Sequence, residues 1–121
     1  MDISTRKYDQ VHVIKLKGNF RLGRDVDEFR EATETVMREG FAQLVVNLAE
    51  VHMMDSSAIG TLVRLMTSSK SRGGDVKLVA PSKLVAQTLK MVGLMNIFEV
   101  HADDAAAIAA FGGETKSASP Q

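Results

Sequence analysis

A short apolar run followed by a polar cluster and a helical pattern constrains this chain more than any other feature. The run, Leu44 to Leu48, is too short for a buried helix and is typical of a strand covered on both faces. After the helical pattern, which ends at Gly73 and Gly74, a second strand is predicted at Val76 to Val79. Strand, helix and strand in this order form a βαβ unit, so we expect parallel pairing with a right-handed crossover.

Two further strands are predicted in residues 2 to 17, where apolar and polar residues alternate. Asp9 and Gln10 are few enough to form a hairpin turn between them, so this pair should be antiparallel. Gly18 and Asn19 are expected to end the second strand. Gly23 should then keep the chain irregular up to about Asp25.

The first helix is predicted from Asp25, where the spacing of apolar residues changes to the period of a helix. Asp25 is the expected N-cap, with Glu28 as its capping-box partner, and Gly40 is the expected stop. Residues 49 to 54 should form a loop after the buried strand, and the second helix should span Ser57 to about Ser71.

The C-terminal part predicts two more helices around a short strand. Pro81 and Ser82 should start the third helix and Gly93 should end it, followed by a strand over residues 97 to 100. Asp103 and Asp104 suit the start of a fourth, alanine-rich helix that runs to residue 111, with glycines at 112 and 113 as its stop. Residues 113 to 121 lack large apolar side chains and are expected to be a disordered tail.

These elements predict one α/β domain over residues 1 to 112. With 121 residues the chain can bury a core without disulfides or metals. We expect a small mixed β-sheet of about five strands packed against about four helices.

Composition excludes several classes of function. The 15 basic and 15 acidic side chains cancel, which argues against a nucleic-acid or anionic membrane partner. Zero cysteines exclude thiol catalysis and fit a reducing compartment. No run approaches the roughly 18 apolar residues of a membrane span, and the N-terminus lacks the apolar core of a signal peptide. We therefore expect a cytoplasmic protein without membrane insertion.

The polar cluster Asp55-Ser56-Ser57 is the candidate functional site. It lies where the buried strand gives way to the second helix, and free N–H groups and the positive dipole end at a helix start favour anionic groups. A structural interpretation is also open, since Asp55 or Ser56 could simply cap the helix. One cap, however, needs one residue, and the cluster supplies more than that.

Other chemistries fit the residues less well. The 3 histidines show no helical ligand spacing, so no metal site or cofactor is predicted. A hydrolase triad of Ser56, His52 and Asp55 would need neighbours in one loop to adopt base and orienter geometry, and the Gly-x-Ser-x-Gly turn is absent. A phosphoryl-accepting receiver domain would need an acidic pair after its first strand, where this chain has Asp9-Gln10 in an expected hairpin, and Asp55 would lie a six-residue loop beyond its strand.

The residues around the cluster resemble a known family. The run Val51 to Gly60, containing Asp-Ser-Ser-x-Ile-Gly, is similar to the signature loop of STAS domains, specifically the bacterial anti-sigma factor antagonists. The preceding strand, Gly73-Gly74, and the run Leu89 to Phe98 also lie where that family has them. The resemblance covers residues 2 to about 111 and implies the STAS fold.

The resemblance also implies a mechanism. In the family, the serine after the aspartate is phosphorylated by a partner that is both anti-sigma factor and serine kinase, and a serine phosphatase resets it. Carried over, Ser56 is the phosphorylation site, Asp55 is its neighbour in recognition and Ser57 is the less favoured target. Phosphate adds roughly −1.5 to −2 charge beside Asp55, so the switch should act on partner binding rather than on folding.

Two positions depart from the family pattern. Arg21 stands where the family often has an acidic residue that reaches the kinase, and Ala58 replaces the commoner glycine. Because of Arg21, the sequence leaves open which partner binds this surface. The oligomeric expectation is a monomer or weak dimer.

The sequence thus predicts a non-catalytic, partner-switching regulator of transcription. Its contact surface is expected to comprise Asp55, Ser56, Ser57, Ile59, Thr61, Leu62, Arg64 and Arg21. The alternative within the fold is the cytoplasmic STAS subunit of a lipid-transport ABC system, which docks a transporter ATPase without phosphorylation. The rival from another class is an enzyme that uses Ser56 as nucleophile.

Overall fold

The computed structural model describes the backbone of residues 1 to 118 and the side chains of residues 1 to 112. A five-stranded sheet with the order β1-β2-β3-β4-β5 forms its centre. The strands are β1 (Asp2–Tyr8), β2 (Val11–Phe20), β3 (Gln43–Met54), β4 (Asp75–Val79) and β5 (Glu99–His101). The helices are α1 (Arg24–Arg38), α2 (Ser56–Ser71), α3 (Lys83–Met91) and α4 (Asp104–Ala118), with a 3₁₀ turn η1 (Leu94–Asn96) after α3.

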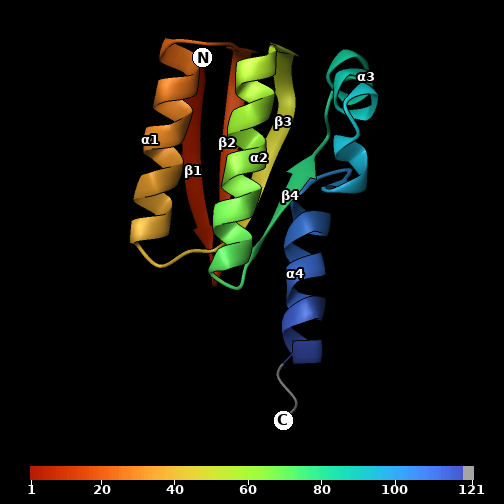
Figure 1. Cartoon of the computed structure of the whole chain (residues 1–121). Coiled ribbons are helices and arrows are strands. Elements are labelled where there is room, and N and C mark those ends of the chain that lie inside the picture. Colours follow the sequence, from red (N-terminus) through yellow and green to blue (C-terminus); the bar gives the residue numbers. More distant parts are fainter. Residues whose placement is uncertain (119–121) are drawn as a thin grey trace.

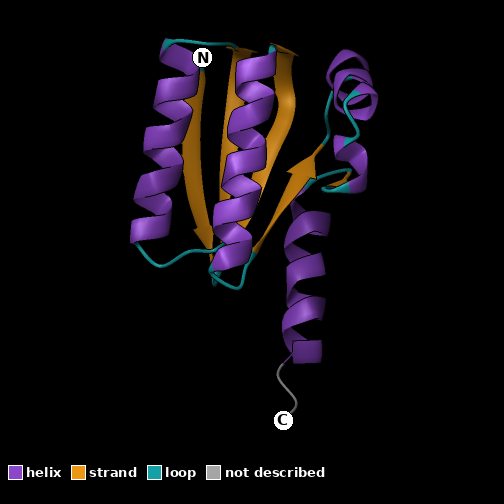
Figure 2. Ribbon diagram, in the orientation of Figure 1, coloured by secondary structure: helices purple, strands orange, loops and turns teal. Residues whose placement is uncertain are grey.

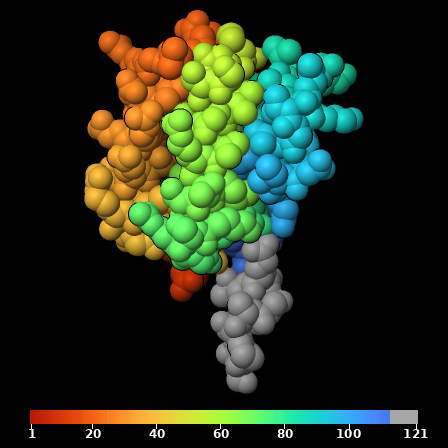
Figure 3. Space-filling model, in the orientation of Figure 1, coloured from red at the N-terminus to blue at the C-terminus, as the bar shows by residue number. Residues whose placement is uncertain are grey.

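The helices form a layer on each face of the sheet. Helices α1 and α2 lie side by side over one face, and α3 contributes to the same core beyond β4 (Figures 1 and 2). Helix α4 packs against the opposite face through its own apolar cluster. The space-filling view shows α1 and α2 covering the first face as neighbouring ridges (Figure 3).

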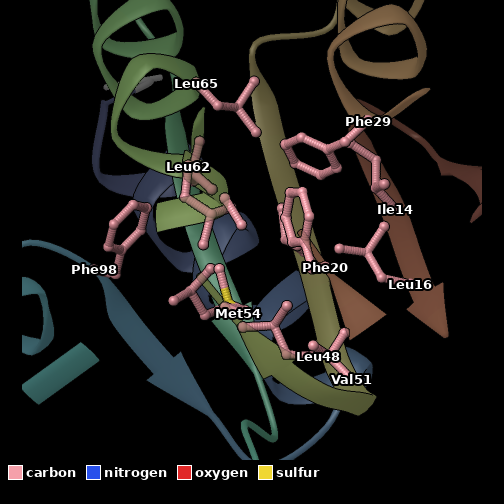
Figure 4. Close-up of a cluster of buried hydrophobic side chains, with 14 of the residues drawn as sticks. Ile14, Leu16, Phe20, Phe29, Leu48, Val51, Met54, Leu62, Leu65 and Phe98 are labelled. Carbon is pink, nitrogen blue, oxygen red and sulfur yellow. The ribbon is translucent and has the colours of Figure 1, made fainter. Parts of the chain in front are cut away.

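Alternating side chains along the strands divide the core between the faces. In β3, Leu44, Val46 and Leu48 point toward α1 and α2, whereas Val45 points toward α4. Phe20 and Phe29 meet in the larger cluster with their ring centroids 4.9 Å apart (Figure 4). The buried run in the sequence is therefore a strand with both faces covered, as predicted.

The predicted pairing directions are confirmed. Strands β1 and β2 pair antiparallel from Asp2 opposite Lys17 to Tyr8 opposite Val11, and the other neighbours pair in parallel. Asp9 has a positive φ of 59°, which closes the hairpin without a glycine. Aspartate tolerates this left-handed conformation better than most residues.

The loop predicted for residues 49 to 54 is wrong, because β3 continues to Met54. The predicted end of the second strand at Gly18 and Asn19 is wrong as well, since β2 continues to Phe20, opposite Met54. Register shifts interrupt the pairing at these positions, and Gly18 has a φ of 114°. A bulge lets a strand continue although the alternation of its side chains is interrupted. The prediction relied on this alternation, so it ended both strands too early.

The cap predicted for the first helix is also wrong. The N-cap of α1 is Gly23, without a side-chain hydrogen bond, and Asp25 lies in the first turn. The Asp25 carboxylate instead accepts a hydrogen bond from the Arg21 N–H and from the Met1 ammonium, at 3.2 Å and 3.3 Å. An acidic side chain in the first turn still stabilises the helix dipole, so the helix forms without the expected cap.

The C-terminal elements follow the prediction in order but not in length. The side chain of Asp103 accepts from the Ala106 N–H at 2.8 Å at the start of α4, as expected. The strand predicted over residues 97 to 100 is shorter and later, Glu99–His101. Helix α4 continues through the glycines at 112 and 113 to Ala118, so their prediction as a stop is wrong.

Part of the predicted tail, residues 119 to 121, lies outside the described residues. The division into a domain and a tail remains a prediction. Among the described residues, no helix has both the length and the hydropathy needed to cross a membrane.

Candidate functional site

Asp55 occupies the junction between β3 and α2. It follows the last strand residue directly and is the N-cap of α2, with extended backbone angles of φ −94° and ψ −179°. Its Oδ1 accepts a hydrogen bond from the Ala58 N–H at 2.9 Å. The capping interpretation of Asp55 is therefore correct, and Ser56 is left without this task.

The other carboxylate oxygen of Asp55 binds a different part of the chain. Oδ2 accepts from the Leu22 N–H at 2.8 Å, and the Asp55 N–H donates to the Phe20 carbonyl at 3.3 Å. Asp55 thus joins the start of α2 to the segment between β2 and α1. These hydrogen bonds hold the two segments next to each other at this end of the sheet.

The hydrogen bonds keep Asp55 ionised. The Leu22 N–H and then the Ala58 N–H lower the pKa of the carboxyl below its ordinary value of 3.8, and the nearby Arg21 guanidinium contributes less. Each donor stabilises the charged form, which burial alone would disfavour. The site therefore carries a fixed negative charge near Ser56 at neutral pH.

The two serines of the cluster differ in their surroundings. Ser56 is the first residue of α2 and is exposed, and within the described part of the chain its hydroxyl forms no hydrogen bond. Ser57 is half-buried, and its carbonyl accepts a hydrogen bond from Thr61 Oγ1 at 2.8 Å. Ser56 is consequently the more accessible hydroxyl.

The remaining predicted contact residues do not share one surface. Arg21 and Arg64 are exposed, and Ile59 is half-buried against the core. Thr61 and Leu62 lie on the buried face of α2, so they pack against the rest of the domain and are not available at the surface. The exposed contact set is therefore smaller than predicted.

Two apolar side chains extend this surface and were missed from the sequence. Leu22 is 72% exposed and follows Arg21, and Met53 is 37% exposed at the end of β3. Asp55 binds the Leu22 backbone, which places Leu22 next to the motif although 33 residues separate them. No pattern in the sequence pairs the two positions, because an isolated leucine in an irregular segment carries no periodic signal.

The structure bears on the alternative chemistries. Both oxygens of Asp55 accept backbone N–H groups, and in the described region no hydrogen bond joins it to His52. Nor do the described residues contain a group of three or more metal-ligating side chains. The argument against a receiver domain assumed a loop before Asp55, and this part was wrong because β3 continues to Met54. The hairpin at Asp9 is confirmed, and it lies at the opposite end of the sheet from Asp55.

The chain forms a small α/β domain with a mixed five-stranded sheet and helices on both faces. Its exposed Ser56 lies at the capped start of α2. The STAS domain profile matches residues 2 to 107, and the chain belongs to the STAS domain family. Its fold is that of anti-sigma factor antagonists, as the resemblance implied.

The similar proteins cover different shares of the chain. A protein of Thermotoga maritima is 28% identical over 65 residues, 54% of this chain and 58% of that protein, so the match spans little more than half of this relative. The anti-sigma-B factor antagonist of Staphylococcus epidermidis is 24% identical over 101 residues, covering 84% of this chain and 93% of that protein.

Solved structures extend the likeness to the fold. The unphosphorylated form of the Bacillus anti-sigma factor antagonist SpoIIAA superposes with a TM-score of 0.77 at 21% identity, covering 92% of this chain and 97% of that one. A sulfate transporter family protein from Wolinella succinogenes has a TM-score of 0.74 at 19% identity, covering 85% of each chain. At such identities the likeness shows the fold alone.

Proposed function

We propose that this protein is a cytoplasmic anti-sigma factor antagonist that binds an anti-sigma factor with serine kinase activity and is released when Ser56 is phosphorylated. The observation that carries the proposal is the pair formed by Asp55 and Ser56. The two carboxylate oxygens of Asp55 accept hydrogen bonds from the Leu22 N–H and from the Ala58 N–H at the start of α2, and the next residue, Ser56, is exposed. The relatives named as anti-sigma factor antagonists support the same role.

The geometry supports a switch that acts on binding. A phosphate on Ser56 would lie at the positive end of α2, where free backbone N–H groups stabilise an anion. It would also lie next to the ionised Asp55, so the surface would change from one to about three negative charges. A partner surface that fits a neutral hydroxyl would be repelled, while the fold would be retained.

The contact surface we propose consists of the exposed side chains at this end of the molecule. Ser56, Met53 and Leu22 give it a small polar centre with apolar neighbours, and Arg64 lies further along α2. The Arg21 guanidinium lies 3.8 Å from Asp25, so part of its charge is already paired within the protein. A partner carboxylate near Arg21 would therefore gain less than it would from a free arginine.

The first experiment combines the protein with ATP and each histidine-kinase-like anti-sigma factor of its genome, and maps phosphate by mass spectrometry. We expect phosphate on Ser56 in the wild type and in Ser57→Ala, which serves as the matched control. Ser56→Ala should remain unmodified while still binding the partner. If no candidate kinase modifies Ser56, the switching mechanism is wrong.

A second measurement addresses release. Phosphorylated protein should lose at least about tenfold in affinity for the kinase, since one charged repulsion at a desolvated contact costs a few kcal/mol. A serine phosphatase of the same system should restore binding. Unchanged affinity after stoichiometric phosphorylation would contradict the proposal even if the site is correct.

A second candidate function is the STAS subunit of a lipid-transport ABC system. The sulfate transporter family neighbour shows that this fold also occurs in transporter proteins. In that case the same end of α2 would dock a transporter ATPase, Ser56 would stay unmodified, and co-purification with an ATPase would be insensitive to Ser56→Ala. Labelling of Ser56 by a fluorophosphonate probe would instead support a serine hydrolase and contradict both binding roles.

A further inference from the structure

An acidic groove lies between β1 and α1, away from the Ser56 surface. It has a volume of about 580 Å³ and is open along one side. Carboxylates of Asp2, Glu28, Glu31 and Glu39 line it, and its lining includes no lysine or arginine side chain. Its size is within the range of ligand sites. The Met1 ammonium also lines it but is paired with Asp25 at 3.3 Å, so the unpaired charges of the lining are acidic.

The groove follows from the position of β1 at the edge of the sheet. Helix α1 lies along this edge (Figure 1), but the side chains between them are small or polar, such as Thr5, Ala32 and Thr35. They do not fill the space, so Ile3 is only half-buried and Thr5 is exposed. Elsewhere on this face, large apolar residues close the gap between helix and strand.

The acidic side chains of α1 recur along the groove. Glu28 and Glu31 of α1 and its C-cap residue Glu39 line the groove and span about 16 Å along the helix axis at 1.5 Å per residue. None of these glutamates, nor Asp2, forms an ion pair with another residue in the described part of the chain. Solvent ions or a bound ligand must therefore reduce the repulsion between these carboxylates.

A buried imidazole gives the second, independent observation. His12 lines the groove, is only 4% exposed, and its Nδ1 has no hydrogen-bond partner among the described residues. Buried polar atoms without a partner are rare in native proteins. A donor from outside the chain would satisfy this nitrogen.

The surroundings of His12 favour a neutral ring. Burial lowers the pKa of His12 below 6.5, and Lys7 acts in the same direction, whereas the nearby Val13 backbone and the charge of Glu39 oppose the change. Phe41 packs edge-on against the imidazole with ring centroids 4.8 Å apart. His12 therefore does not neutralise the carboxylates, and Lys7 is not part of the lining.

We propose that this groove binds a linear polyamine, an alkyl chain that carries several ammonium groups. Ammonium groups would pair with the glutamates along α1, and one near His12 would supply the missing donor. The alkyl segments between them would lie on Ile3, Ala32 and Val36, which form the apolar part of the lining. A single compact metal ion would use only one end of so long a groove.

The test uses the full chain with spermine at low ionic strength, followed by calorimetry. We expect one binding site, weakened at least about fivefold by Glu31→Gln and by Glu39→Gln, since each removes one ion pair at a partly exposed position. Glu34→Gln is the matched control, because Glu34 lies on α1 but lines a different groove, beside Arg30 and Arg64. Equal weakening by all variants would show general charge attraction and overturn the proposal.

The histidines provide a readout at the site itself. The imidazole proton signals of His12 should shift on titration with spermine, whereas those of His52 on β3 and His101 on β5 should not. Magnesium added at the same total charge should leave the His12 signals in place. A shift of His52 or His101, no shift of His12, or an equal shift with magnesium would each contradict the polyamine site.

Discussion

The two faces of the sheet are built in different ways. The face under α1, α2 and α3 is an apolar core that includes Phe20 and Phe29 (Figure 4). The face under α4 holds a much smaller apolar cluster and a buried cation, since Lys77 on β4 is 0% exposed. The candidate functional site lies at the edge of the first face, where α2 begins.

Ionic contacts take the place of apolar packing under α4. The Lys77 ammonium lies 3.0 Å from the Glu99 carboxylate and 3.4 Å from that of Asp75, and it sits 4.6 Å from the centre of the Phe111 ring. Asn47 on β3 also donates to the Asp104 carboxylate at 2.8 Å. The contacts of Lys77 with Phe111 and of Asn47 with Asp104 hold α4 against the sheet, and polar contacts of this kind add less net stability than the same area of apolar contact.

The difference suggests separate tasks for the faces. The larger core supplies most of the stability of the domain and holds the start of α2 in place. The switch that we propose at Ser56 therefore requires no change of fold. The α4 face is held by a few specific contacts, so α4 should open before the rest of the chain. Each of the following predictions tests this division.

The largest expected effect is at the aromatic residues of the two clusters. Phe20→Ala should lower the free energy of unfolding by about 3–5 kcal/mol, because it leaves a cavity in the main core. Phe111→Ala should lower it by only about 2 kcal/mol, since α4 can detach instead of bearing the full cost. Urea unfolding measures both, and amide exchange should accelerate in α4 alone for Phe111→Ala. Equal losses would show that the faces contribute alike.

Asp55→Ala should have the next largest effect, a loss of about 2 kcal/mol. It removes the cap on α2 and the hydrogen bond from the Leu22 N–H. Thr67→Ala, at an exposed position of the same helix, is the control and should change stability much less. A loss at Asp55 no larger than the control would mean that other contacts hold the start of α2 and the segment between β2 and α1.

The same carboxylate predicts a pH dependence. Because the pKa of Asp55 in the folded protein lies below its ordinary value of 3.8, the contribution of Asp55 to stability is fully present above that pH and is lost as the pH falls through the folded pKa. The stability difference between wild type and Asp55→Asn should therefore shrink below about pH 4. Unfolding curves from pH 7 to pH 3 would show this, and a constant difference would contradict the assignment.

Substitution of the buried cation should have a smaller effect. Lys77→Met should change stability by less than about 1 kcal/mol in either direction, because an apolar side chain avoids the cost of burying charge. Glu99→Gln keeps that charge buried and should destabilise by about 1 kcal/mol, a modest loss because the Glu99 side chain is 53% exposed. A much larger loss for Lys77→Met than for Glu99→Gln would show that Lys77 stabilises the fold beyond its ion pairs.

The smallest expected effect on stability is at Ser56. Ser56→Asp should change the free energy of unfolding by less than about 0.5 kcal/mol, because Ser56 is exposed and a negative charge at the helix start is tolerated. Partner affinity should fall in the same variant. A large loss of stability would instead assign Ser56 a structural role.

The order of elements and the location of the motif could be predicted from the sequence because both depend on local patterns. Alternation identified β1 and β2, and a continuous apolar run identified β3 up to Leu48. Helical spacing identified α1 and α2, and the polar residues after β3 marked the start of α2. The errors arose where alternation failed, at the bulges that extend β2 and β3, and where Asp25 binds Arg21 and Met1 instead of capping α1.

The sequence by itself determined a βαβ domain of the STAS family type with an Asp-Ser-Ser helix start and Ser56 as the candidate switch. Only the tertiary structure decided that Asp55 binds Leu22, that Thr61 and Leu62 are unavailable at the surface, and that Lys77 is buried under α4. Secondary structure follows from neighbours in sequence, whereas these contacts join segments that only the packed sheet brings together.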